Sequence, residues 1–217
     1  FVQAMRDAGP AGWSFMAQVL PRLEAAGDQD LVEDLLRSMP DRPDAVLGDA
    51  VARFLPHAQL RQIALQTIVP LWGERAKKPL MEALEHADEP TRVIALAELR
   101  KLHAIDEYVF SVVERFLTMK GSAGEDLRVA AAAALADASA PVRMRAIQLL
   151  TKAVEGKRGL VALIRGTGDN EETASVLEAM GRSLLALDRN EGMKALKGRV
   201  SRSEGATKQR LAALLQS

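Results

Sequence analysis

The sequence predicts an all-α protein built from stacked antiparallel helix pairs, and three observations lead to this fold class. Of the 217 residues, 36 are Ala and 30 are Leu, whereas only eight are Phe, Trp or Tyr. Ala and Leu favour helices, while aromatic and β-branched residues suit strands. Gly and Pro interrupt the chain at short intervals, which marks the turns between segments. The segments also recur with a nearly constant spacing of 30 to 34 residues between successive pairs.

The helices are expected between these breaks, in segments of eight to eighteen residues. That is the usual length of a globular helix. Within the segments apolar residues recur with the helical period, as in Val93, Leu96 and Leu99. No segment alternates with the period of two that indicates a strand. We expect helices at about 11–26, 28–39, 43–55, 57–70, 73–87, 90–103, 106–119, 124–137, 140–154, 158–165, 170–187, 190–200 and 204–216.

Several of these helices begin with recognisable capping residues. Asp28 and Asp106 precede apolar runs, and each is expected to cap the helix that follows it. Pro43, Pro90 and Pro141 are expected in first turns, where the missing N–H of proline would have no partner in any case.

The spacing of the pairs predicts an α-solenoid. Pairs begin at about 11, 43, 73, 106, 140 and 170, and a last helix begins at 204. A period in the low thirties, filled by two helices and a turn, is typical of such repeats, in which neighbouring pairs stack to bury their apolar faces. The Ala run at 130–134 fits close stacking because small side chains let helices approach one another. An irregular helical bundle would give the same helices without this spacing.

Two segments carry a more specific pattern. Each has Pro at the helix start, an adjacent Arg and Val, and then Ala and Leu on the buried face. They are 88–95 with Leu99, and 139–143 with Ala146, Leu149 and Leu150. This pattern resembles the consensus of HEAT repeats, of the wider HEAT-like and armadillo type. Segments 126–130 and 60–64 match more weakly, and the resemblance covers residues 57–155 best.

The resemblance implies a right-handed α-solenoid of about six antiparallel helix pairs, with residues 1–217 forming a single HEAT-like domain. It also implies that the second helix of each pair lines a concave side. The register departs from the family, because the match at 90 falls on a second helix and the match at 141 on a first helix. Either the pairing shifts near 104–125, or one helix there is an insertion. Because the chain starts within an apparent helix at Phe1, we expect it to be a fragment of a longer one.

Charge is balanced overall but distributed unevenly along the chain. Lys and Arg number 29, as do Asp and Glu, so the net charge is zero. Residues 1–110 hold 12 basic and 17 acidic residues, whereas residues 111–217 hold 17 basic and 12 acidic residues. A basic half can attract an anionic partner. The alternative is a solvated surface on which charge is unevenly shared.

No catalytic or metal-binding pattern is found, so we expect no enzyme activity, no metal and no cofactor. The absence of Cys excludes disulfides and thiolate zinc sites, and fits a reducing, cytoplasmic location. His86 with Asp88 and Glu89 is the nearest group to a metal site, but these residues span a turn, where solvated caps are common. No apolar run is long enough to predict a membrane span.

The leading functional hypothesis is a non-catalytic scaffold or adaptor for protein–protein interaction, because a solenoid offers an extended surface of repeated side chains. The alternative is a nucleic-acid-binding module that uses the basic C-terminal half, either non-specifically or in the manner of the HEAT-like DNA glycosylases. Zero net charge weakens this alternative. So does the position of Trp13 and Trp72, which both lie in the N-terminal half.

Basic residues at turns and helix ends of the C-terminal half are the candidate partner-binding residues. Arg predominates there, and its planar guanidinium binds carboxylate or phosphate through two hydrogen bonds. Arg143 matches the Arg of the family pattern and is expected to pair with an acid of a neighbouring repeat. We expect an acidic segment of a protein partner to bind at Lys157, Arg158, Arg165, Arg189, Lys194 and Lys197.

Overall fold

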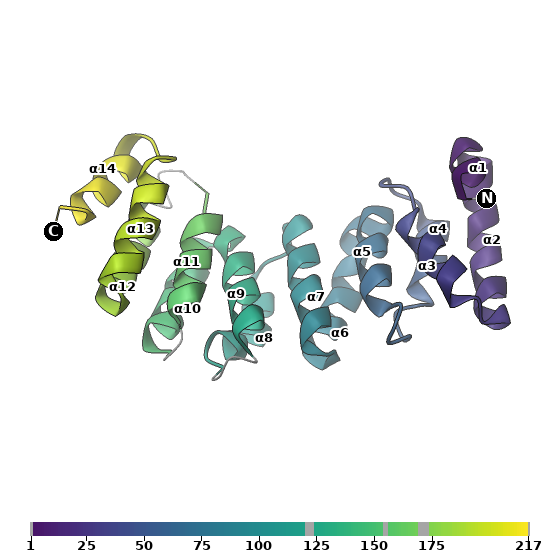
Figure 1. Ribbon diagram of the computed structural model, residues 1–217, viewed down its shortest axis with the longest axis horizontal. Helices are drawn as coiled ribbons and strands as arrows, with labels where there is room; N and C mark the ends of the chain where they lie inside the picture. The colour runs from purple at the N-terminus through teal and green to yellow at the C-terminus, as the bar shows by residue number, and fades with distance from the viewer. Residues whose placement is uncertain (1, 120–123, 154–155, 169–173, 217) are drawn as a thin grey trace. The chain divides into compact units, whose positions relative to one another are not determined.

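The computed structural model describes residues 2–119, 124–153, 156–168 and 174–216, and these are helical apart from short turns (Figure 1). No strand occurs among the described residues. The all-α fold class is therefore confirmed. Contacts divide the chain into two compact units, residues 1–98 and 99–217, with the boundary inside helix α7. Each unit is described by itself, and the single domain expected from the sequence stays a prediction.

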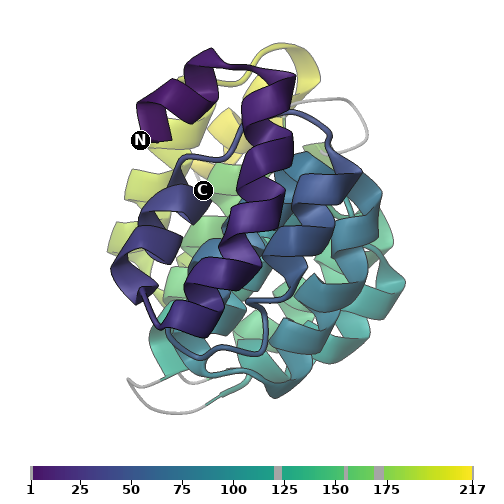
Figure 2. The ribbon, with the colours of Figure 1, turned by 90° about the vertical axis from the view of Figure 1, so that its right-hand side faces the viewer.

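Unit 1, residues 1–98, begins with a short helix followed by a long one, which runs along the front of the unit in Figure 2. Its later helices are shorter. They pack in an alternating pattern, in which α2 contacts both α3 and α4, and α5 contacts both α3 and α4. The helices are α1 (Val2–Asp7), α2 (Pro10–Ala26), α3 (Gln29–Arg37), α4 (Ala45–Ala52), α5 (Arg61–Trp72), the 3-10 helix η1 (Gly73–Ala76), α6 (Lys77–His86) and most of α7 (Glu89–Lys101).

Unit 2, residues 99–217, forms two layers of helices. In one layer α9 contacts α11 and α11 contacts α13, and in the other α8, α10, α12 and α14 contact one another in turn. The consecutive pairs α8 and α9, α10 and α11, α11 and α12, α12 and α13, and α13 and α14 also touch across the layers. The helices that follow the end of α7 are α8 (Glu107–Leu117), α9 (Glu125–Ala134), the 3-10 helix η3 (Leu135–Asp137), α10 (Ala140–Lys152), α11 (Lys157–Gly166), α12 (Ala174–Leu187), α13 (Arg189–Val200) and α14 (Gly205–Leu214).

Most of the expected helix starts are confirmed. The carboxylate of Asp28 accepts a hydrogen bond from the Leu31 N–H at 3.2 Å, and that of Asp106 accepts one from the Val109 N–H at 3.0 Å. Pro90 and Pro141 lie in the first turns of α7 and α10.

The expectation for Pro43 was wrong. The side chain of Asp44 caps α4 by accepting from the Leu47 N–H at 3.0 Å, so the helix begins at Ala45 and Pro43 precedes the cap. At the other end of the next helix, Pro70 lies inside α5, which continues to Trp72. Around 104–125 the described residues include α8 and the start of α9, and the alternatives of a shifted pairing and an inserted helix both stay predictions.

Small residues set the packing of α11 against α9 and η3. Ala131 and Ala132 are fully buried. A Cβ added at Gly166 would lie 2.7 Å from the Cβ of Ala136, which is closer than non-bonded carbon atoms approach. The Ala run therefore serves the close stacking that the sequence predicts, and glycine on α11 is part of the same contact.

We expect Gly166→Ala to lower the free energy of unfolding by about 1–3 kcal/mol, because the added methyl group overpacks the contact with Ala136. Gly198→Ala is the matched control. Gly198 lies within α13, and a Cβ there meets no atom within 4 Å. Its substitution should raise stability by about 0.5–1 kcal/mol, the usual gain of replacing glycine inside a helix. Urea denaturation followed by circular dichroism measures both, and equal effects would contradict the close packing.

Candidate partner-binding site

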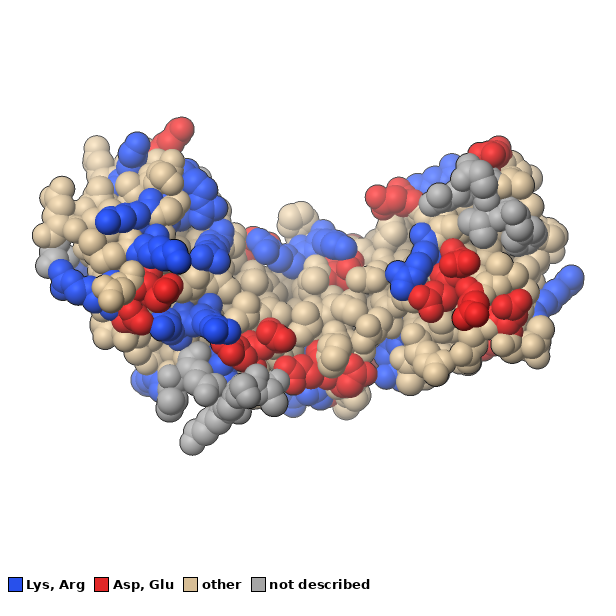
Figure 3. Space-filling view, viewed as in Figure 1, with Lys and Arg blue, Asp and Glu red and all other residues tan. Residues whose placement is uncertain are grey.

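All six candidate residues lie on α11 and α13, which are neighbours in one layer of unit 2. Figure 3 shows Lys and Arg side chains gathered over the part of unit 2 that carries these helices, at the left of the view. Unit 2 holds 19 Lys and Arg against 14 Asp and Glu, whereas unit 1 holds 10 against 15. The structure thus places the candidates on one layer of the unit that carries the positive surplus.

Lys157 forms an ion pair that ties α11 to α13. Its Nζ lies 2.8 Å from Oδ2 of Asp188, whose Oδ1 accepts a hydrogen bond from the Glu191 N–H at 3.0 Å. Asp188 is therefore both the N-cap of α13 and the partner of Lys157. The hydrogen bond with Asp188 raises the pKa of Lys157. The same bond, together with the Glu191 N–H, lowers the pKa of Asp188.

Arg158 also has an acidic partner within unit 2. Its Nη1 lies 2.6 Å from Oε1 of Glu125, so this pair links α11 to α9. The Arg158 side chain is 70% exposed, and exposed pairs of this kind contribute little to stability. Because Lys157 and Arg158 are partly neutralised by Asp188 and Glu125, they offer less charge to a partner than their positions in the sequence indicate.

The other four candidates are better placed to bind an anion. Their side chains are exposed, and no acidic group among the described residues lies within ion-pair distance of them. Arg165 lies in the last turn of α11, and Arg189 begins α13. We call this set the α11–α13 surface, and it consists of Arg165, Arg189, Lys194 and Lys197.

Two other arginines near helix starts have a different role, since each binds the backbone of the preceding turn. Arg92 donates to the carbonyl oxygen of Glu85 at 3.1 Å, and Arg143 donates to that of Ala136 at 3.2 Å. Both bonds reach back seven residues, and both arginines follow a Pro by two positions. The expectation for Arg143 was an acidic partner, and its hydrogen bond described here is to a backbone carbonyl. Because only 7% of Arg143 is exposed, it is not part of the α11–α13 surface.

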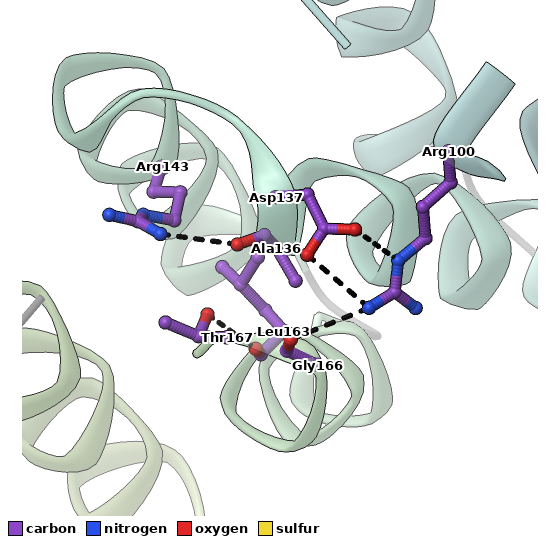
Figure 4. Close-up of polar contacts among 7 residues, drawn as sticks. All are labelled: Arg100, Ala136, Asp137, Arg143, Leu163, Gly166 and Thr167. Carbon is purple, nitrogen blue, oxygen red and sulfur yellow. Dashed lines mark hydrogen bonds and ion pairs between the residues drawn. The ribbon is translucent and has the colours of Figure 1, made fainter. Parts of the chain in front are cut away.

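Arg100, at the end of α7, joins three elements of unit 2 (Figure 4). Its Nε lies 2.5 Å from Oδ2 of Asp137 in η3, and its Nη2 lies 3.4 Å from Oδ1 of the same carboxylate. The same Nη2 also donates to the carbonyl oxygen of Gly166 at the end of α11, at 3.4 Å. Two bonds from one guanidinium group to one carboxylate hold the side chains in a defined orientation, and they also place opposite charges together. We therefore infer that Arg100 stabilises the packing of these elements.

The structure reveals a groove in unit 2 that the sequence analysis missed. It has a volume of about 590 Å³ and is formed by α12, the start of α13 and α14. Of the six candidates only Arg189 lines it, together with Arg182 of α12 and Arg210 of α14. The signal in the sequence was the spacing of Glu178, Arg182 and Leu185 along one face of a helix. This spacing indicates a groove only once it is known which helices lie alongside α12.

In the described part of the chain, no group of three or more His, Asp or Glu side chains is arranged to hold a metal ion. His86 lies 3.4 Å from Glu85, and His57 lies 2.8 Å from Glu24. No helix in these segments combines the length and the apolar character that a membrane span requires.

The ion pair between Lys157 and Asp188 should stabilise unit 2 only while both groups are charged. Because folding lowers the pKa of Asp188, its carboxylate adds fully to the stability of unit 2 above the ordinary carboxyl pKa. This added stability is lost as pH falls through the lowered pKa. Because folding raises the pKa of Lys157, its ammonium group adds fully to the stability of unit 2 below the ordinary Lys pKa. This added stability is lost as pH rises through the raised pKa. The pair should therefore act between about pH 4 and pH 10.

We expect Lys157→Met to lower the melting temperature at pH 7 and to lose this effect in strong acid. Asp188→Asn should be milder than Asp188→Ala, because the Asn oxygen can still accept the Glu191 N–H. Lys152→Met, at an exposed position of α10, is the control. A Lys157→Met effect as large at pH 2 as at pH 7 would contradict the ionic origin.

Comparison with known proteins assigns no family to the chain, since no family model, no curated protein and no solved structure matches it. The resemblance to HEAT repeats therefore stays a prediction from the residues that carry it. The functional argument accordingly rests on the geometry and charge of unit 2.

Proposed function

We propose that the protein is a non-catalytic interaction scaffold of the HEAT-like α-solenoid type, and that unit 2 binds an acidic segment of a protein partner. The observation that carries this proposal is the α11–α13 surface. Its four cations come from two adjacent helices, and no acid among the described residues neutralises them. A surplus of this kind attracts a segment rich in Asp and Glu and speeds its association.

The arrangement of helices supports the solenoid part of the proposal. Within unit 2 the helices alternate between two layers, so that every second helix along the chain faces the same side. The candidate residues on α11 and α13 therefore lie on neighbouring helices of one layer. Solenoids recognise partners on the extended concave surface that their stacked repeats create. The absence of Cys from the sequence supports a cytoplasmic setting for this binding.

Nucleic acid is the second candidate for the same surface. Arg and Lys without acidic partners also bind phosphates, and the surplus of positive charge in unit 2 favours this reading. The overall net charge of zero weakens it, since nucleic-acid-binding domains usually carry a basic excess. A protein partner predicts binding of an acidic peptide, whereas a nucleic-acid partner predicts tighter binding of DNA. One experiment with both probes therefore separates the two candidates.

We expect a fluorescent oligoglutamate peptide to bind the protein, and the triple variant Arg165→Glu, Lys194→Glu, Lys197→Glu to bind it at least about tenfold more weakly, a loss of about 1.4 kcal/mol. The control triple is Arg115→Glu, Lys152→Glu, Lys208→Glu. It makes the same change of charge at exposed positions of α8, α10 and α14, in the other layer. Fluorescence anisotropy at about 50 mM and about 200 mM salt measures both.

Equal loss in the two triple variants would show that only net charge matters and would overturn the assigned surface. Tighter binding of duplex DNA than of oligoglutamate, with a steep dependence on salt, would favour the nucleic-acid candidate. Binding of neither probe at low salt would contradict the proposed function. Circular dichroism melting curves confirm that the variants are folded.

A further inference from the structure

The groove formed by α12, the start of α13 and α14 has an apolar floor. Leu185 and Met193 are half-buried along it, and Leu214, at 9% exposed, closes its base. Its walls include Ala186 and Ala213, which are small and exposed. A volume of about 590 Å³ is within the range of ligand-binding pockets, about 300–1,000 Å³. We call this feature the α12–α14 groove.

Positive charge surrounds this floor. Arg182, Arg189 and Arg210 come from three different helices, whereas Glu178 is the only acidic residue among the described residues that line the groove. Glu178 lies 2.6 Å from Arg182 and 3.8 Å from Arg210, so one carboxylate is shared between two guanidinium groups. Arg189 has no acidic group of the described chain within ion-pair distance. The described lining of the groove therefore has a net positive rim above an apolar floor.

The lining of the groove is a second face of α12, separate from the face that forms the core. Leu177, Met180 and Leu184 are buried inside unit 2. Arg182 and Leu185 lie on the groove side of the same helix. A helix that packs only within its own unit needs one apolar stripe with a polar face opposite. On α12, the half-buried Leu185 lies beside the exposed Arg182. Leu185 is therefore part of a second apolar stripe, and this stripe is bordered by charged residues.

We propose that the α12–α14 groove binds an acidic amphipathic helix of a protein partner, with leucine-sized side chains on the floor and carboxylates at Arg189 and Arg210. This rests on the proposed function, since it locates the apolar anchor of the same acidic segment beside the α11–α13 surface, which shares Arg189. Grooves between helices commonly receive the apolar face of a further helix. A nucleic acid fits this groove less well, because none of the described residues that line it is aromatic and could stack on a base.

The test uses the full chain and two labelled synthetic peptides of about 18 residues, which span about five helical turns. One has Leu on one face, at positions three and four residues apart, with Glu elsewhere. The other has Gln in place of every Leu. We expect the Leu peptide to bind at least about tenfold more tightly, as the burial of one leucine-sized side chain predicts.

Ala213→Trp should fill the groove without changing any charge. It should weaken binding of the Leu peptide about tenfold and leave oligoglutamate binding unchanged. Ala206→Trp is the matched control, at an exposed position of α14 that does not line the groove. Arg189→Glu should weaken both probes, whereas Lys208→Glu, also exposed on α14 and outside the groove, should have little effect.

The outcomes separate the inference from the proposed function. If oligoglutamate binds and responds to the triple reversal on α11 and α13, but the Leu peptide binds no tighter than the Gln peptide, the proposed function stands and the groove assignment is overturned. Equal effects of Ala213→Trp and Ala206→Trp would overturn it as well. If sedimentation shows self-association that Ala213→Trp abolishes, the occupant is a second copy of this chain, and the proposal fails. If none of the acidic probes binds, both proposals are overturned.

Discussion

The packing within each unit depends on one constraint, which is that short helices cannot bury their apolar faces alone. Within unit 2, α8, α10, α11 and α12 meet this constraint by each touching the next helix and the next but one. Double contact of this kind requires close approach, and the buried Ala residues of α9 with Gly166 of α11 allow it. Larger side chains there would separate α9 from α11 and expose the core. The Ala-rich composition is therefore a consequence of the packing as well as of helix propensity.

Short helices also create many helix ends, and each end leaves carbonyl oxygens without partners inside the helix. Arginines supply part of the missing hydrogen bonding. Arg143, near the start of α10, reaches the carbonyl of Ala136. Arg100, at the end of α7, reaches the carboxylate of Asp137 in η3 and the carbonyl of Gly166 in α11. These arginines are committed to the fold. The positive charge available to a partner therefore comes from the other Lys and Arg residues of unit 2.

Unit 2 therefore contains two populations of basic residues that look alike in the sequence. Some hold turns or pair with acids of neighbouring helices, as Lys157 does with Asp188. Others are exposed on α11 and α13 without such an acid among the described residues, and one of them, Arg189, also lines the α12–α14 groove. Binding of an acidic, partly apolar segment would use the second population and leave the first intact. Recognition and stability would then be separable, because different side chains carry them.

The sequence by itself determined the helices and their order. Local signals suffice for that, since capping by Asp28 and Asp106 and the helical period of apolar residues act within a few residues. Pro43 was misplaced because proline suits a first turn while the adjacent Asp44 suits a cap, and the Asp44 carboxylate takes the cap by accepting the Leu47 N–H. Only the tertiary structure decided which cations meet an acid and where a groove forms. Lys157 and Asp188 are 31 residues apart, and the groove joins three helices, so both depend on which helices pack side by side.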